Sequence, residues 1–211
     1  MGEDSDAASR SKGLERLLGL TDDVFAFAIT LLVLELVTPV VVGSPTNSSL
    51  ASALAGEWPS FFDYLVSFWV IGFQWLGHHH IFRYIKRSDE RLLLLNLLFL
   101  FFIVLVPFAT RVLDNYESLP LAVAVYGLVQ VGASLIIPLI WRYASGGRRL
   151  VDERISQRTA SWLGTRGLVI SAMFAASIPF AFIYSRLPIV WWLAILPVII
   201  VLDRRYGRET K

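Results

Sequence analysis

Long apolar stretches separated by short polar segments divide this 211-residue chain into six candidate membrane spans. A helix needs about 20 mostly apolar residues to cross about 30 Å of hydrocarbon. The stretches cover approximately 17–38, 60–84, 91–113, 119–142, 164–185 and 188–203, of which the last is the shortest. The pattern therefore predicts an all-α integral membrane protein with six transmembrane helices.

The connections are too short for a further folded domain. Residues 38–57, rich in Pro, Gly, Ser and Asn, predict an outer turn, and 143–163 predict a basic, polar link on the opposite side. We assign 14–203 to one six-span domain. The flanking parts are a polar cytoplasmic N-terminal segment, 1–13, and a basic cytoplasmic tail, 204–211.

Composition and charge support this topology. Hydrophobic residues make up 55% of the chain and the mean hydropathy is +0.60, outside the range of ordinary soluble domains. Of the 19 lysines and arginines, all except Arg111 and Arg186 fall on the same side of the predicted spans. By the positive-inside rule that side is the cytoplasm, and both termini lie there. We expect a multi-pass protein of the plasma or inner membrane whose first span, too long for a signal-peptide core, is retained.

Several function classes are disfavoured by what the sequence contains. The absence of cysteine removes disulfides, thiolate metal sites and a cysteine nucleophile. No nucleophile with a base, and no metal pair, stands at a recognisable spacing, so we expect neither an enzyme nor a cofactor. The pI near 9.0 follows the topology, and anionic lipid rather than nucleic acid is the expected partner. His78, His79 and His80 point about 100° apart on a helix and do not predict a metal site.

The seven tryptophans lie mostly toward the ends of spans, which predicts interfacial anchoring. They are Trp58, Trp69, Trp75, Trp141, Trp162, Trp191 and Trp192.

The first span has an apolar face and an acidic start. Phe27, Leu31 and Leu34 recur at i, i+4 and i+7, with Thr30 beside them. A carboxylate in hydrocarbon costs about 2.5–3.5 kcal/mol, so Asp22 needs a partner or water. It lies about 140° around the helix from Phe27, which directs it toward neighbouring helices. Taken alone, the apolar stripe favours contact with lipid or packing in a core over lining a pore.

Two further acids are candidates for attracting cations. Asp23 lies nearer the apolar stripe and suits a water-filled cytoplasmic vestibule. Glu35 lies near the outer end of the span, where it either attracts cations or reaches interfacial water. Asp63 lies near the outer end of the second span.

A polar cluster is predicted at the cytoplasmic ends of the first three spans. Either Arg16 or a histidine is expected to pair with Asp22, and Asn96 to hydrogen-bond across helices, at about 0.6–2 kcal/mol for such a contact. Its members are Arg16, Thr21, Asp22, His78, His79 and Asn96.

These residues resemble the transmembrane protein 175 family of potassium channels. Its pattern, Arg-x-x-x-Phe-Ser-Asp before an apolar helix that contains threonine, reads here Arg16, Leu20, Thr21 and Asp22, with Leu replacing Phe and Thr replacing Ser. Other matching features cover about the first half of the chain. They are Trp75 with His78, His79 and His80, the stretch from Asp89 to Asn96, and Pro107-Phe108-Ala109-Thr110.

The resemblance implies a passive potassium channel. Members lack the Thr-Val-Gly-Tyr-Gly filter, which is also absent here, and six-span members assemble as homotetramers whose first helices line a central pore. The constriction would fall on Phe27, Leu31 and Leu34, and a hydroxyl layer that favours potassium on Thr30. Phe27 replaces the usual isoleucine, and its π face can interact with cations. The permeant ion is then the only expected ligand.

The same resemblance implies that the polar cluster braces the pore helix. The alternative function is a proton-coupled secondary transporter that uses Asp22, Asp63 or a histidine as a relay. Inverted repeats would favour the transporter, and the sequence reveals none.

Overall fold

The computed structural model describes residues 2–116, 118–148, 150–152 and 155–184, together with Pro188, Trp191, Trp192 and Ala194. Side chains are described from residue 12 onward. The predicted tail, 204–211, and most of the predicted last span, 188–203, lie outside these residues. Within them the chain is helical, and its elements are α1 (Gly2–Leu32), η1 (Val33–Glu35), α2 (Asn47–Gly56), α3 (Trp58–Phe82), α4 (Glu90–Asn115), α5 (Pro120–Ser145), η2 (Gly146–Arg148) and α6 (Gln157–Ala181).

Five predicted spans coincide with helices, within a few residues at most ends. Among the described residues, four helical segments are long and apolar enough to cross a membrane, and they are Lys12–Glu35, Glu90–Asn115, Pro120–Arg148 and Gln157–Ala181. Helix α3 is 25 residues long, but Asp63, Gln74 and three histidines make it less apolar. A multi-pass membrane protein is therefore supported, and the count of six spans stays a prediction.

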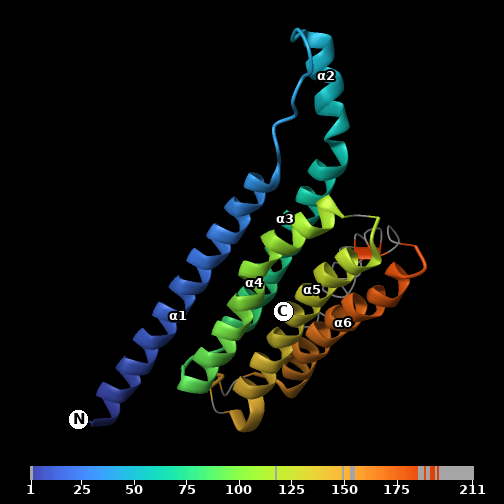
Figure 1. Ribbon diagram of the computed structural model, residues 1–211. Coiled ribbons are helices and arrows are strands. Elements are labelled where there is room, and N and C mark those ends of the chain that lie inside the picture. Colours follow the sequence, from blue (N-terminus) through green and yellow to red (C-terminus); the bar gives the residue numbers. More distant parts are fainter. Residues whose placement is uncertain are drawn as a thin grey trace.

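The expected outer turn at 38–57 contains a helix, which the Gly/Ser/Asn composition concealed. Helix α2 begins after Thr46, whose side chain accepts a hydrogen bond from the Ser49 backbone N–H at 3.1 Å, while the Ser49 hydroxyl accepts from the Thr46 N–H at 2.9 Å. This reciprocal capping satisfies donors that a helix start otherwise leaves unpaired. Helix α2 then continues toward α3 and projects beyond the other helices (Figure 1).

The helices form a bundle with α1 at one edge and α6 at the other (Figure 1). Helix α1 packs against α4 and α3, α4 packs against α5, and α5 packs against α6. The backbone of α1 already begins at Gly2, so the predicted N-terminal segment continues this helix.

The two connections at one end of the bundle are joined through their backbones. Ile85, which follows α3, forms an isolated antiparallel bridge with Val151, which follows α5. The Lys86 N–H donates to the Leu150 carbonyl at 2.8 Å, and the Asp152 N–H donates to the Tyr84 carbonyl at 3.1 Å. Residues 150–152 of the link are therefore docked on the α3–α4 connection.

Two of the predicted interfacial tryptophans are instead buried. Trp141 and Trp192 are each 2% exposed. The Trp141 indole N–H donates to the Ala160 carbonyl at 2.6 Å, and that of Trp192 donates to the Ser177 hydroxyl at 2.9 Å. An internal acceptor removes the need for interfacial water, which is why anchoring was the wrong interpretation for these two. Trp58 and Trp69 are exposed, as interfacial anchors are.

Candidate functional site

Helix α1 has one face that packs on its own chain and one that does not. The packed residues recur every three to four positions, as one face of a helix requires. They are Leu17, Thr21, Phe25, Ala28 and Leu32, which are between 0% and 4% exposed. Helices α4 and α3 cover this face.

The opposite face of α1 carries two of the predicted constriction residues, Phe27 and Leu31, and the third, Leu34, follows in η1 because the α-helix ends at Leu32. Phe27 and Leu34 are each 68% exposed and Leu31 is 40% exposed. Thr30 is also exposed, and its hydroxyl donates to the Phe27 carbonyl at 2.9 Å. Because that bond uses the hydroxyl proton, the lone pairs of the oxygen remain available to a cation. The four residues thus share an uncovered face, and their roles in a pore stay predictions.

The predicted vestibule residue Asp23 lies at the same uncovered side of α1. Asp23 is exposed, and so is Leu20, which lies three residues earlier on the same helix. An exposed carboxylate attracts cations over roughly a Debye length, about 8–10 Å at physiological salt. The position is compatible with the predicted role and does not test it.

A buried hydrogen-bonded chain attaches the packed face of α1 to α4 and α3. The Asn96 side-chain N–H donates to the Thr21 hydroxyl at 2.9 Å, and Asn96 Oδ1 lies 2.8 Å from His78 Nε2. The Thr21 hydroxyl in turn donates to the Leu17 carbonyl at 2.9 Å. Since an amide oxygen only accepts, His78 Nε2 donates and the chain runs in one direction. All three side chains are at most 2% exposed.

Aromatic rings hold the His78 imidazole in place. The ring of Phe82 stacks on it at a centroid distance of 4.0 Å, and that of Phe99 at 5.3 Å and nearly parallel. Phe99 also contacts Phe25 of α1 at 5.7 Å. Ring packing and the hydrogen bonds of His78 therefore hold α1, α3 and α4 together in the same region.

Asp22 has a partner that the sequence pattern did not reveal. The Trp75 indole N–H donates to Asp22 Oδ1 at 2.8 Å, and the His79 ring stacks on Trp75 at 5.5 Å. Arg16 is exposed, and within the described residues it forms no ion pair with Asp22. Trp75 was therefore wrongly interpreted as an anchor alone. The signal was present, because a carboxylate in a span needs a donor at equal depth.

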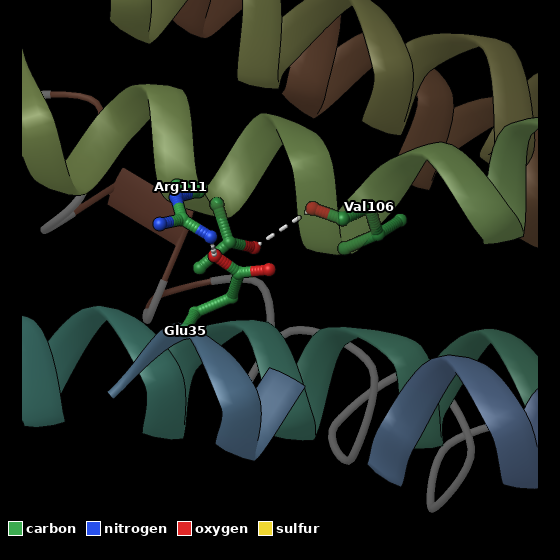
Figure 2. Close-up of polar contacts among 4 residues, drawn as sticks. Glu35, Val106 and Arg111 are labelled. Carbon is green, nitrogen blue, oxygen red and sulfur yellow. Dashed lines mark hydrogen bonds and ion pairs between the residues drawn. The ribbon is translucent and has the colours of Figure 1, made fainter. Parts of the chain in front are cut away.

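Glu35 forms an ion pair rather than standing free at the outer end of α1. Its carboxylate oxygen lies 3.2 Å from a guanidinium nitrogen of Arg111 on α4 (Figure 2). The Glu35 side chain is 17% exposed and that of Arg111 is 58% exposed. The positive charge of Arg111 offsets the negative charge by which Glu35 was expected to attract cations. The geometry instead makes Glu35 an attachment of η1, directly after α1, to α4.

A second buried polar cluster joins α3, α4 and α5. The Thr110 hydroxyl donates to the Ser67 hydroxyl at 2.9 Å, and Ser67 lies 3.1 Å from the Tyr126 hydroxyl. Two turns further along α3, the Gln74 amide donates to the Gln130 amide oxygen at 2.7 Å. The signal for this cluster was a set of polar residues inside apolar spans, which are retained only with partners.

Metal binding finds no support in the geometry. The described residues contain no group of three or more His, Asp or Glu side chains that could hold an ion. His78 is hydrogen-bonded to Asn96, and the ring of His79 stacks on Trp75.

Comparisons with known proteins identify the family of this chain. The model of the family described as endosomal/lysosomal potassium channel TMEM175 matches residues 16–107. A potassium channel from Streptomyces collinus is 35% identical over 176 residues, which cover 82% of this chain and 84% of that protein. The chain belongs to the TMEM175 family.

Structural likeness extends the TMEM175 match beyond the first half of the chain. The crystal structure of a lysosomal potassium-selective channel TMEM175 homolog from Chamaesiphon minutus superposes with a TM-score of 0.76 at 25% identity, covering 92% of this chain and 98% of that one. A human relative, called an endosomal/lysosomal proton channel, is 28% identical over 167 residues, 76% of this chain but 32% of that protein. These TMEM175 relatives are channels, not enzymes.

Proposed function

We propose that this chain is one subunit of a potassium-permeable channel that conducts passively. The observation that carries the proposal is the division of α1 into a face fixed by its own chain and an apolar face that the described chain leaves uncovered. The names of the bacterial relatives support potassium as the ion. They do not favour the alternative, a proton-coupled transporter.

A single helix face cannot enclose a pore, so the proposal needs several copies of the chain. Closed cyclic symmetry is the ordinary way to arrange identical subunits. The position of α1 at the edge of the bundle leaves it free to meet its symmetry mates (Figure 1). We take the assembly to be a homotetramer in the cell membrane, with α1 at the central axis.

In this assembly the exposed residues of α1 line the ion path. Phe27, Leu31 and Leu34 form apolar layers, and an apolar constriction gates by excluding water. Thr30 adds a layer of hydroxyl oxygens beside Leu31. Asp23 lies toward the predicted cytoplasmic mouth, where it concentrates cations.

Contacts within the subunit set the position of the pore helix. Thr21, Asn96 and His78 fix its inner half, with Trp75 on Asp22, while Arg111 on Glu35 fixes its outer end. Arg16 and His79 lie beside the inner contacts, and we assign them to this support. The diameter of the constriction then depends on residues that never meet an ion.

Potassium flux from proteoliposomes tests the proposal. Vesicles loaded with potassium chloride are placed in sodium chloride with a protonophore, and a pH-sensitive dye reports the compensating proton entry. We expect flux with the wild-type protein, and about tenfold more with Leu31→Ser, since about 1.4 kcal/mol off a barrier is a tenfold change in rate. Thr30→Val should lower the preference for potassium over sodium.

The matched control is Leu168→Ser, at a leucine that is 53% exposed on α6, the edge of the bundle opposite α1. It makes the same substitution on an exposed apolar surface away from α1 and should leave the flux unchanged. Equal flux in wild type and Leu31→Ser, or flux that requires stoichiometric proton exchange, would reject the channel proposal.

A further inference from the structure

The packed face of α1 continues one turn toward the N-terminus, to Gly13. This glycine lies four residues before Leu17, so it falls on the same side of the helix. A Cβ added at Gly13 would stand only 2.9 Å from the Ser88 hydroxyl oxygen, a separation that native Cβ atoms essentially never show. Helix α1 therefore meets Ser88 through its backbone, and glycine is the residue that allows this close approach.

Gly19, on the same helix, provides the contrast. It is exposed, and a Cβ added there would meet nothing within 4 Å. Glycine inside a helix is disfavoured relative to alanine. The contact with Ser88 gives a physical reason for the glycine at residue 13, whereas the described part of the subunit gives none for Gly19.

Ser88 is backed by the rest of the bundle. It is 9% exposed and lies in the connection between α3 and α4. The next residue, Asp89, accepts a hydrogen bond from the Leu92 N–H at 2.9 Å and so caps α4, while its other carboxylate oxygen accepts from the Tyr143 hydroxyl of α5 at 2.6 Å. Short hydrogen bonds to a carboxylate are stronger than those between neutral groups. These bonds hold the connection in place beside α1.

Helix α5, which holds Asp89, packs closely on both of its neighbours. A Cβ added at Gly132 of α5 would overlap the Phe102 ring of α4, and one added at Gly167 of α6 would stand 2.9 Å from Pro138 of α5. Interiors packed this densely transmit a displacement rather than absorb it. Helices α4, α5 and α6 thus form a firm support, and Ser88 is the part of it that meets Gly13.

We propose that Gly13 and Ser88 form the inner anchor of α1, the contact that sets how far the predicted cytoplasmic end of this helix stands from the ion path. The inference rests on the channel proposed above, with α1 at the central axis. In that assembly the subunit lies behind α1, so a side chain at residue 13 pushes the inner end of the helix toward the axis and narrows the path. Both are positioning residues, since they act through the position of α1.

A cycle of alanine substitutions tests the contact, with Gly19→Ala as the matched control. Gly19→Ala should raise the midpoint of thermal unfolding by about 2–4 °C, because alanine is the better helix former. Gly13→Ala should not raise it, since the new Cβ collides with Ser88. In the Ser88→Ala background, which lacks the hydroxyl oxygen, the same change at Gly13 should raise the midpoint as Gly19→Ala does.

Potassium flux per assembled protein tests the role in conduction. Gly13→Ala should lower this flux about fivefold, within the range for substitutions that act on a site from a distance. Adding Ser88→Ala should restore the flux to the level of Ser88→Ala alone. A defect in folding alone would instead reduce the amount of assembled protein on gel filtration and leave the flux per assembly unchanged.

An introduced disulfide tests whether the contact persists in the conducting protein. The chain contains no cysteine, so a new pair has no competing thiols. Two cysteines at these positions would lie near the separation of about 3.5–4.5 Å between Cβ atoms that a disulfide needs. Gly13→Cys with Ser88→Cys should form the bond under mild oxidation, and Gly19→Cys with Ser88→Cys should not. Because the anchor is fixed, the oxidised protein should conduct no less than the reduced one.

Any of four results would overturn the inner anchor. They are equal rises in the unfolding midpoint for Gly13→Ala and Gly19→Ala, flux in Gly13→Ala that equals or exceeds that of the wild type, no rescue by Ser88→Ala, and a cysteine pair that either fails to form the disulfide or stops the flux when oxidised. A wild type that carries no potassium would reject the channel, and with it the role in conduction. Thermal unfolding and disulfide formation would still decide whether Gly13 contacts Ser88, so the two failures are distinguishable.

Discussion

The two faces of α1 differ in where their partners come from. The packed face meets side chains of the same subunit through Thr21. Asp22 beside it contacts Trp75, and Glu35 of η1 contacts Arg111. The other face, from Leu20 to Leu34, exposes large apolar side chains that no described part of the chain covers. One face is therefore complete in a single subunit, while the other depends on lipid or on further copies.

This difference separates stability from conduction. Substitutions on the packed face should act first on folding and assembly, because they leave buried donors or acceptors without partners. Substitutions on the uncovered face should act on flux, because they remove no contact between α1 and another described helix. Isosteric changes at the two threonines of α1 distinguish these effects most cleanly.

The largest effect on stability is expected for Thr21→Val, compared with Thr30→Val. The first removes the acceptor of the Asn96 amide in a buried site, at a cost of about 1–3 kcal/mol. The second is exposed and should change stability by less than about 0.5 kcal/mol. Thermal unfolding of the purified variants measures both, and equal losses would abolish the distinction between the faces.

We expect the contact between Trp75 and Asp22 to contribute less to the free energy of unfolding, about 1 kcal/mol. Trp75→Phe keeps an aromatic ring for His79 but removes the indole N–H. A double-mutant cycle of Trp75→Phe and Asp22→Ala isolates the pair, and strictly additive losses would show that the contact contributes nothing.

Asp22→Ala should also reduce assembly or flux more than it alters the preference for potassium. Gel filtration and flux from the same preparation measure the two quantities. Normal assembly together with changed selectivity would indicate that Asp22 lines the ion path and does not support α1.

The smallest effect is expected at the outer end of α1. Because Arg111 is 58% exposed, its ion pair with Glu35 should contribute about 0.2–1 kcal/mol. A cycle of Glu35→Gln and Arg111→Gln should give a coupling energy that falls as salt is raised. A coupling insensitive to salt would indicate a hydrogen bond rather than a screened charge pair.

The sequence was sufficient for the elements that depend on local pattern. Runs of apolar residues located α1, α3, α4, α5 and α6, because each helix satisfies its own backbone within one segment. The same reasoning missed α2, whose capping by Thr46 and Ser49 is local but whose composition is typical of a turn. Whether this segment is helical depends on which local preference prevails, the capping by Thr46 and Ser49 or the tendency of its composition to form a turn.

Contacts between helices were predicted less well. Depth along the spans brought Thr21, Asn96 and His78 into one region, but it did not identify Trp75 as the partner of Asp22. Depth gives the height of a residue in the membrane, whereas the rotation of each helix is set by packing across the bundle. Trp141 and Trp192 were misjudged for the same reason.

The bridge between Ile85 and Val151 has a consequence for how this protein tolerates change over evolution. Its hydrogen bonds join backbone atoms, so they do not depend on which side chains stand at exposed positions such as Lys86 and Arg87. Substitutions there can accumulate without loosening the junction, but an insertion or deletion shifts the register of both loops. Related chains should therefore vary more in the identity of these residues than in the lengths of the two loops.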